Sequence, residues 1–154
     1  MAANEVPRIQ IATAVLVRDG LILLAHRHPQ RHAYADRWSF VGGHVDPGES
    51  PGEAVARECL EEIGVQIHHP VPFPMTVDNP DLEMHAFLVT QWTGDPSNAA
   101  PEEHDELGWF HPSALATLRM AHPESVPGIL TAVRRATGTT GPVSAADGVP
   151  RTDR

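Results

Sequence analysis

The chain of 154 residues carries a formal net charge of −9, with ten histidines and one cysteine. This length suits one domain around a single core. The acidic balance argues against a nucleic-acid duplex as partner, and a lone cysteine cannot form an intrachain disulfide. No apolar run approaches membrane-spanning length and the N-terminus lacks an apolar signal core, so we expect a cytoplasmic protein without a membrane partner. The chain has no lysine, so any phosphate clamp must use arginine.

The first structured segment is predicted to be a β-hairpin. Residues 1–8 resemble a flexible N-terminal tail. From Ile9 to Leu24, two apolar runs rich in β-branched residues flank Asp19-Gly20. This dipeptide between alternating apolar residues is a strong signal for a two-residue hairpin turn.

A polar loop over residues 28–37 follows the hairpin and is a candidate rim for a substrate; it contains Arg37. Arg27, just before this loop, is interpreted either as a phosphate or base contact or, slightly favoured, as a solvated strand end. Residues 38–41 then read as a short strand. Its first residue, Trp38, is expected in the core rather than on a stacking surface.

The central segment is predicted to be a glycine-rich loop followed by one helix. Ser50 is a plausible N-cap, Pro51 suits the first helical position, and Glu53 completes a capping box with Ser50. Gly64 lies where a left-handed C-cap residue belongs. At 3.6 residues per turn, one side of this helix is apolar. The predicted apolar stripe consists of Ala56, Cys59, Leu60 and Ile63.

The other side of the helix carries Glu58, Glu61 and Glu62. Like charges at this spacing repel by about 0.2–0.5 kcal/mol per pair, and the helix dipole disfavours anions near the C-terminus. A solvated acidic face is the ordinary interpretation, but a bound cation would relieve both conflicts. Mg²⁺ prefers a few carboxylates plus substrate phosphates. Glycines in the preceding loop can expose backbone carbonyls to a metal; they are Gly42, Gly43 and Gly48.

This segment resembles the Nudix box, a single sequence pattern in which glycine, glutamate, arginine and apolar residues occupy defined positions. The matching positions are Gly43, Glu49, Arg57, Glu58, Glu61, Glu62, Gly64 and Val65. The one soft match is Cys59, at a position usually held by Leu, Ile or Val. Cysteine behaves as a small buried hydrophobe, so the resemblance stands.

The second half of the chain alternates predicted strands and loops before two helices. The predicted strands cover residues 65–67, 83–92 and 107–110, and the predicted helices cover residues 112–118 and 126–136. Residues 68–74 are rich in proline and are predicted to be a loop. Residues 137–154 are low in apolar content and are predicted to be a flexible C-terminal tail.

An acidic cluster precedes the predicted strand at residues 107–110. In many nucleoside-triphosphate-cleaving relatives of the family, such a cluster supplies a further metal ligand. Glu102 is the closest match, with Glu103 and Asp105 as alternatives, and a solvated acidic loop is an equally good interpretation.

Other signals are weaker. The histidines at 26, 28 and 32 lie close in sequence but show no metal-ligand pattern, whereas His44, inside the box loop, merits a test. Pro72-Phe73-Pro74 resembles a motif of the NADH-cleaving branch but lies too close to the box. Pro80 lies roughly where the ADP-ribose branch carries a proline.

The resemblance implies an α/β fold for residues 9–136: a Nudix-type α/β/α sandwich with a mixed β-sheet between helices. It implies a Mg²⁺-dependent hydrolase, with Mn²⁺ as a possible substitute, acting on a nucleoside diphosphate linked to another group. The leading expectation is a MutT-like reaction, in which a nucleoside triphosphate is hydrolysed to the monophosphate and pyrophosphate. The alternatives are an ADP-ribose or other dinucleotide pyrophosphatase and a non-catalytic nucleotide-binding module. We expect a monomer or a homodimer.

The resemblance also implies residue roles. Glu61, Glu62 and the Gly42 carbonyl would bind metal, and Glu58 would bind metal or act as the base. Arg57 and Glu49 would orient this set. The candidate substrate contacts are Arg27, Arg37, Gly43 and His44.

Overall fold

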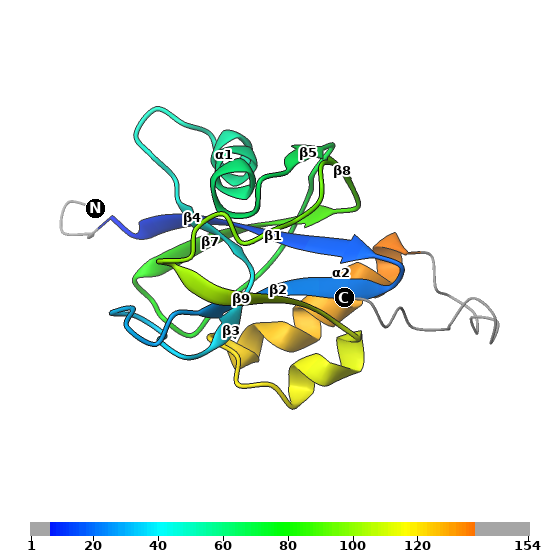
Figure 1. Ribbon diagram of the computed structural model, residues 1–154. Helices are drawn as coiled ribbons and strands as arrows, with labels where there is room; N and C mark the ends of the chain where they lie inside the picture. The colour runs from blue at the N-terminus through cyan, green and yellow to red at the C-terminus, as the bar shows by residue number, and fades with distance from the viewer. Residues whose placement is uncertain (1–6, 138–154) are drawn as a thin grey trace.

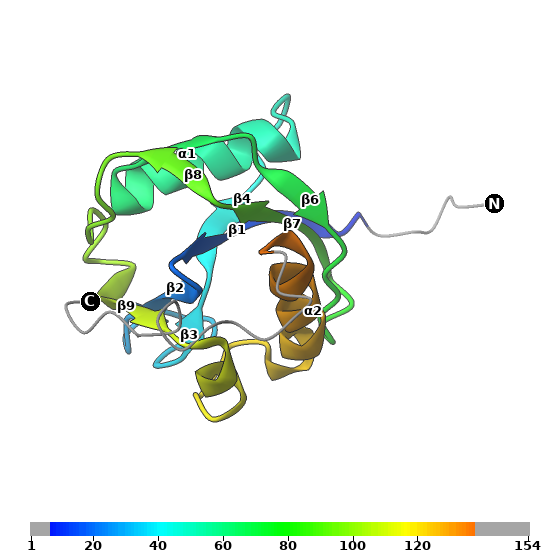
Figure 2. The same cartoon turned by 90° about the vertical axis from the view of Figure 1, so that its right-hand side faces the viewer.

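The computed structural model describes residues 7–137, in which a mixed β-sheet has one helix against each face (Figure 1). Helix α1 (Pro51–Ile63) covers one face, and helix α2 (Val126–Ala136) covers the other (Figure 2). The predicted α/β/α sandwich is therefore confirmed. Of the two predicted tails, residues 1–6 and 138–154 lie outside the described part. No helix within the described residues is long and apolar enough to cross a membrane.

The strands are short except for those at the centre of the sheet. They are β1 (Ile9–Arg18), β2 (Leu21–Arg27), β3 (Trp38–Ser39), β4 (Val41–His44), β5 (Gln66–His68), β6 (Val71–Phe73), β7 (Leu82–Val89), β8 (Gln91–Thr93) and β9 (His104–Phe110). Two 3₁₀ turns, Pro112–Ala116 and Pro123–Ser125, lead from β9 to α2.

Strand β1 organises the sheet. Its first half pairs antiparallel with β4, its end pairs antiparallel with β2, and its other edge pairs in parallel with β7. Strand β2 continues to β3 and β9, β7 continues to β6, and β5 and β8 form a separate pair. The β1–β2 hairpin turns at Asp19 and Gly20, with φ of 54° and 77°, as predicted.

Side chains that alternate along β1 divide the core into two layers. Ala12, Ala14 and Leu16 face the layer under α1, whereas Val15 and Val17 face the layer under α2. This period of two is that of a strand buried on both faces. The layer under α2 also receives the half-buried ring of Trp38, the packing role predicted for it.

Both ends of α1 are as predicted. Ser50 accepts from the Glu53 backbone N–H, Glu53 completes the capping box, and Gly64 adopts the left-handed conformation with φ of 71°. The predicted apolar stripe is partly wrong, because Leu60 is 59% exposed. The buried positions are Ala54, Val55, Cys59, Glu62 and Ile63. The helix is rotated so that a glutamate, rather than Leu60, faces the core.

The predicted boundaries fail where short strands depend on a neighbour. Residues 71–73, predicted as loop, form β6 because β7 offers its free edge for pairing. The predicted strand at residues 83–92 is divided into β7 and β8, which belong to different sheets. The predicted glycine loop begins as β4, since Gly42 and Gly43 pair with β1. The short helix predicted at residues 112–118 is present as a 3₁₀ turn that ends earlier, at Ala116.

Candidate active site

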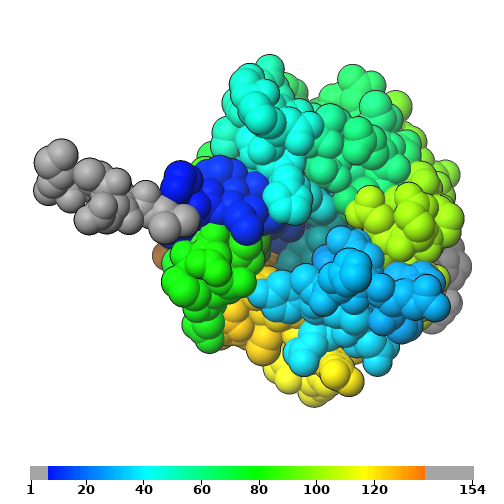
Figure 3. Space-filling model, turned by 90° about the vertical axis from the view of Figure 1, so that its left-hand side faces the viewer, coloured from blue at the N-terminus to red at the C-terminus, as the bar shows by residue number. Residues whose placement is uncertain are grey.

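A cleft of about 880 Å³ lies beside α1 and β4. Figure 3 shows the hollow on this face of the molecule, bordered by the start of β1, by β4 and by the loop over residues 28–37. Its walls come from segments far apart in sequence, so it is a product of the tertiary fold. One end of the cleft is acidic and the other is largely apolar.

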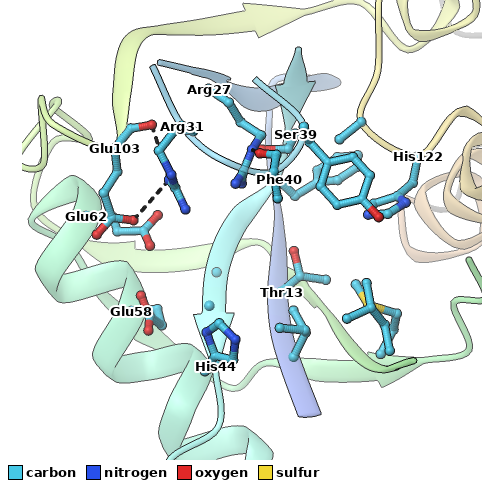
Figure 4. Close-up of a pocket in the computed structure, with 18 of the residues that line it drawn as sticks. Thr13, Arg27, Arg31, Ser39, Phe40, His44, Glu58, Glu62, Glu103 and His122 are labelled. Carbon is cyan, nitrogen blue, oxygen red and sulfur yellow. Dashed lines mark hydrogen bonds and ion pairs between the residues drawn. The ribbon is translucent and has the colours of Figure 1, made fainter. Parts of the chain in front are cut away.

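The acidic end collects the glutamates that sequence analysis selected. Those lining the cleft are Glu58, Glu61 and Glu62 from α1, and Glu102 and Glu103 from the segment before β9. Gly42, Gly43 and His44 of β4 lie along the same end. Figure 4 shows the Glu58, Glu62 and Glu103 side chains on one side of the cleft. Asp105, the third candidate of the acidic cluster, does not line the cleft and instead pairs with His26 at 2.7 Å.

Arg57 joins the carboxylates of this end into one network. Its Nε and Nη2 donate to the two oxygens of Glu49 at 2.8 and 3.0 Å. Its Nη1 donates to Glu58 at 3.0 Å and to Glu61 at 3.3 Å, and Nη2 also donates to the His44 carbonyl at 3.0 Å. Hydrogen bonds from Arg57 are the main reason that the pKa of Glu49 is lowered to about 2.

This network corrects one expectation. From the sequence, the three helix glutamates are expected to repel one another until a bound cation relieves the conflict. Arg57 offsets the charge of Glu58 and of Glu61, so only Glu62 keeps the predicted conflict.

At both glycines of β4, a side chain would meet a close neighbour: backbone at Gly42 and the Glu58 side chain at Gly43. A Cβ on Gly42 would collide with the Ala12 carbonyl of the paired strand. A Cβ on Gly43 would lie 2.5 Å from Oε2 of Glu58. Glycine at position 43 therefore lets the Glu58 carboxylate lie against the backbone of β4.

Glu62 is the buried member of the set, at 4% exposure. Burial, with the nearby Glu58 and Glu103 carboxyl groups adding to it, raises the pKa of Glu62 well above its ordinary value. His104, the first residue of β9, is also buried, and its Nε2 lies 3.7 Å from Oε1 of Glu62. Burial lowers the pKa of His104. Sequence analysis missed this histidine, because no local pattern shows that it faces Glu62.

The raised pKa of Glu62 predicts a pH dependence for the metal-free protein. The folded state binds a proton that the unfolded state releases above about pH 4.5, the unfolded carboxyl value. Below that pH, ionisation of Glu62 therefore costs no free energy of unfolding. As pH rises toward the folded pKa, the free energy of unfolding declines by at most about 1.4 kcal/mol per pH unit.

Urea unfolding in EDTA at about pH 6 and about pH 8 measures this decline. We expect wild type to lose more stability over this interval than Glu62→Gln, which has no carboxyl to ionise. Equal losses in the two proteins would contradict the assignment.

Two arginines lie between the acidic and apolar ends (Figure 4). Arg31 belongs to the loop over residues 28–37 that was predicted as a substrate rim, and it lines the cleft. It donates to the Glu103 carbonyl at 3.3 Å and lies 3.5 Å from the Glu103 carboxylate. Arg27 donates to the Ala33 carbonyl at 3.0 Å, and its guanidinium lies 6.0 Å from the centre of the Tyr34 ring. Burial and the charge of Arg31 lower the pKa of Arg27. Arg27 ends β2 as expected, but it is half-buried and lines the cleft rather than being fully solvated.

The other end of the cleft is lined mainly by apolar and aromatic side chains. They include Ile11, Phe40, Met75, Leu82, Met84 and Met120. A few polar groups lie among them. The Tyr34 hydroxyl accepts a hydrogen bond from the Asn79 side-chain amide at 3.2 Å. The centres of the Tyr34 and His122 rings are 4.5 Å apart. An apolar chamber with a few polar groups is typical of a small-molecule site.

Arg37 is the predicted substrate contact that the structure leaves outside the cleft. Its guanidinium instead lies 3.5 Å from the Met120 carbonyl. Of the early histidines, His26 forms ion pairs with Asp36 at 3.1 Å and with Asp105 at 2.7 Å.

The acidic end offers the donor chemistry that a hard divalent cation needs, namely several carboxylate oxygens. The side chains are not gathered into a finished coordination sphere: the described residues contain no group of three or more acidic, histidine or cysteine side chains placed to hold a metal ion. Between residues 7 and 137, no arginine pairs with Glu62, unlike Glu58 and Glu61. The residues therefore fit a metal ion in their chemistry, with side-chain rotation needed to close around it.

The chain belongs to the Nudix family, since the NUDIX domain family model matches residues 8–129. It is thus a hydrolase of the pyrophosphohydrolase class, and the predicted family and kind of enzyme are confirmed. It is 32% identical over 122 residues to the CTP pyrophosphohydrolase of Escherichia coli K12, which covers 77% of this chain and 87% of that relative.

Two further comparisons bear on fold and substrate. The MutT NUDIX hydrolase from Burkholderia pseudomallei superposes with a TM-score of 0.70 at 30% identity, covering 81% of this chain and 99% of that one. The NAD-capped RNA hydrolase NudC of Stutzerimonas stutzeri is 36% identical over 119 residues, or 73% of this chain. This chain covers only 40% of the length of that NudC.

Proposed function

We propose that this protein is a Mg²⁺-dependent, MutT-like pyrophosphohydrolase that converts a nucleoside triphosphate to the monophosphate and pyrophosphate. The observation that carries the proposal is one cleft that combines an acidic end, two arginines and an apolar chamber. A nucleoside triphosphate has the matching parts, with its phosphates near the acidic end and its base in the chamber. The similarity to a CTP pyrophosphohydrolase over most of both chains supports the same reaction.

The proposed metal ligands are Glu58, Glu61, Glu62 and the Gly42 carbonyl, with Glu103 or Glu102 as the further carboxylate. When bound, Mg²⁺ supplies positive charge against the phosphates and makes water more acidic. Mn²⁺ is a proposed substitute. Glu103 has Arg31 as a partner, whereas no ion pair is seen for Glu102 within the described residues.

The remaining roles follow from position. Arg57, braced by Glu49, holds the Glu58 and Glu61 carboxylates in a defined orientation. Glu58, which Arg57 holds beside Gly43, is proposed either as a metal ligand or as the general base. Arg27 and Arg31 contact the phosphates, because they supply the positive charge between the two ends of the cleft.

Two more candidate contacts lie at the rim. Gly43 brings backbone close to the substrate, and His44 is an exposed residue at the end of β4. Arg37 is withdrawn as a contact, since its side chain is used at Met120. The cytoplasmic location, the lack of a duplex or membrane partner, the domain span 9–136 and the monomeric or homodimeric state stay predictions from the sequence.

The second candidate is cleavage of a dinucleotide, such as ADP-ribose, at its diphosphate. The similarity to NudC favours it, whereas the earlier sequence signals, Pro80 and the Pro72–Pro74 motif, do not line the cleft. A non-catalytic binding module fits poorly with the similarity to two relatives that are named as hydrolases.

Product analysis separates the two candidates. With Mg²⁺, we expect nucleoside triphosphates to yield the monophosphate and pyrophosphate, at kcat/KM about tenfold or more above that for ADP-ribose, equivalent to about 1.4 kcal/mol. Ion-exchange chromatography of the products from CTP, ATP, GTP and ADP-ribose measures this. Faster formation of AMP and ribose 5-phosphate from ADP-ribose would favour the second candidate, and orthophosphate as the product from triphosphates would contradict the MutT-like reaction.

A further inference from the structure

His104 has a buried imidazole ring whose nitrogens lack a hydrogen-bond partner within the described residues. Both of its ring nitrogens are inaccessible to solvent and make no hydrogen bond. A buried polar group in that condition is unfavourable and rare in folded proteins. The nearest acidic atom recorded for it is Oε1 of Glu62, 3.7 Å from Nε2, which is too far for a hydrogen bond. Rotation of the Glu62 side chain would be enough to close that distance.

Backbone hydrogen bonds hold the two residues opposite each other. The Ala99 N–H donates to the Glu62 carbonyl at 2.9 Å, which ties the segment before β9 to the end of α1. The His104 N–H donates to the Ala100 carbonyl at 3.2 Å, and the Asn98 side chain donates to the His104 carbonyl at 2.7 Å. These bonds hold the backbone of His104 next to the backbone of Glu62. A small rotation of the Glu62 side chain or of the imidazole ring would therefore be enough to bring Nε2 and a carboxylate oxygen within hydrogen-bond distance.

Glu62 also stands apart from the other glutamates of α1. Glu58 and Glu61 each have Arg57 as a partner. Within residues 7–137, the basic side chain that pairs with Glu62 is His104. A carboxylate that gives one oxygen to a metal ion is commonly oriented by a hydrogen bond to its other oxygen.

We propose that His104 is a positioning residue for Glu62, donating a hydrogen bond from Nε2 to one carboxylate oxygen when the other oxygen binds a divalent metal ion in the cleft. This inference rests on the proposed function, because it takes Glu62 as a metal ligand. His104 itself lies outside the residues lining the cleft and does not touch the substrate. A histidine that only fills space in the core would instead affect stability and leave metal binding unchanged.

The test measures Mn²⁺ binding directly, by the electron paramagnetic resonance signal of free Mn²⁺, with no substrate present. We expect His104→Phe, which keeps a ring but has no donor, to weaken Mn²⁺ binding about 10- to 100-fold. His104→Gln, which can place an amide N–H near the position of Nε2, should recover at least a third of wild-type affinity. The control is His26→Gln: His26 is a half-buried histidine paired with Asp36 and Asp105 away from the cleft, and Mn²⁺ binding should be unchanged.

A double-mutant cycle supplies the sharper result. In a Glu62→Gln background, His104→Phe should weaken Mn²⁺ binding by less than twofold, because the group that His104 positions has lost its charge. Melting temperatures in EDTA, read on the same proteins, should not follow the order of Mn²⁺ affinities. If His104→Phe does not fold, His104→Asn takes its place with the same expectation, since its shorter side chain cannot reach Glu62.

The outcomes distinguish this inference from the proposed function. If the wild type binds Mn²⁺ and the affinity of His104→Phe or His104→Asn for Mn²⁺ is within twofold of the wild-type affinity, the positioning role alone is overturned. An equal loss in the wild-type and Glu62→Gln backgrounds also overturns that role. Wild type that does not bind Mn²⁺ overturns both the positioning role and the metal site on which the proposed function depends.

Discussion

Replacing Glu61 by glutamine is expected to lower kcat for nucleoside triphosphate hydrolysis by about 10²- to 10³-fold, equivalent to about 2.7–4 kcal/mol in the transition state. Glu61 lies in the cleft with its side chain 58% exposed, and within residues 7–137 it forms an ion pair with Arg57 at 3.3 Å. An exposed pair of this kind contributes little to stability. A large loss of activity would therefore reflect chemistry rather than unfolding. Steady-state kinetics with CTP or ATP and Mg²⁺ measure the effect.

Substrate binding should weaken much less than turnover in the Glu61→Gln variant, because the base and ribose contacts lie at the other end of the cleft. The matched control is Glu106→Gln, which removes another exposed carboxylate that does not line the cleft and should keep wild-type kcat. Near wild-type turnover by Glu61→Gln would show that Glu61 is not a metal ligand in the reaction.

Arg57→Lys is expected to lower kcat about 10- to 100-fold although it keeps the positive charge. The guanidinium of Arg57 binds both oxygens of Glu49 while a third nitrogen reaches Glu58 and Glu61. A lysine ammonium is a single point donor and cannot hold these carboxylates in the same planar arrangement. The carboxylates should then lose their orientation toward the phosphates, and kcat should fall more than KM rises.

The control for this variant is Arg8→Lys. Arg8 forms an exposed ion pair with Glu83 at 3.1 Å, away from the cleft, and its replacement should leave kcat unchanged. Circular dichroism at the assay temperature would establish that both variants are folded. Retention of kcat within about threefold by Arg57→Lys would mean that charge alone, without the geometry of the guanidinium, is sufficient.

The sequence alone was sufficient wherever structure depends on residues close together in the chain. The N-cap at Ser50, the C-cap at Gly64 and the hairpin turn at Asp19-Gly20 are all present as predicted. Each is decided by backbone conformation and hydrogen bonds within a few residues, so local sequence is enough. The box pattern likewise identified the family, because its many defined positions lie in one continuous segment.

Tertiary structure decided which side of α1 is buried. From the sequence, Leu60 belonged to the core and Glu62 to the outer acidic face, yet Leu60 is exposed and Glu62 is buried. The orientation of a helix about its own axis is set by what it packs against. Here α1 packs against β4, and His104 at the start of β9 faces Glu62; neither contact can be read from helical periodicity.

Only folding decided which residues from outside the box face its glutamates. Arg31 and His104 belong to a polar loop and a strand end that carry no motif, and Arg37 resembles Arg31 in sequence while pointing elsewhere. What distinguishes these residues is their position relative to α1, which depends on long-range pairing of β2 with β9 and of β1 with β4. The sequence alone therefore determined the family, the two helices and the box glutamates. The partners of those glutamates, and the cleft itself, depend on contacts between segments that only the folded chain brings together.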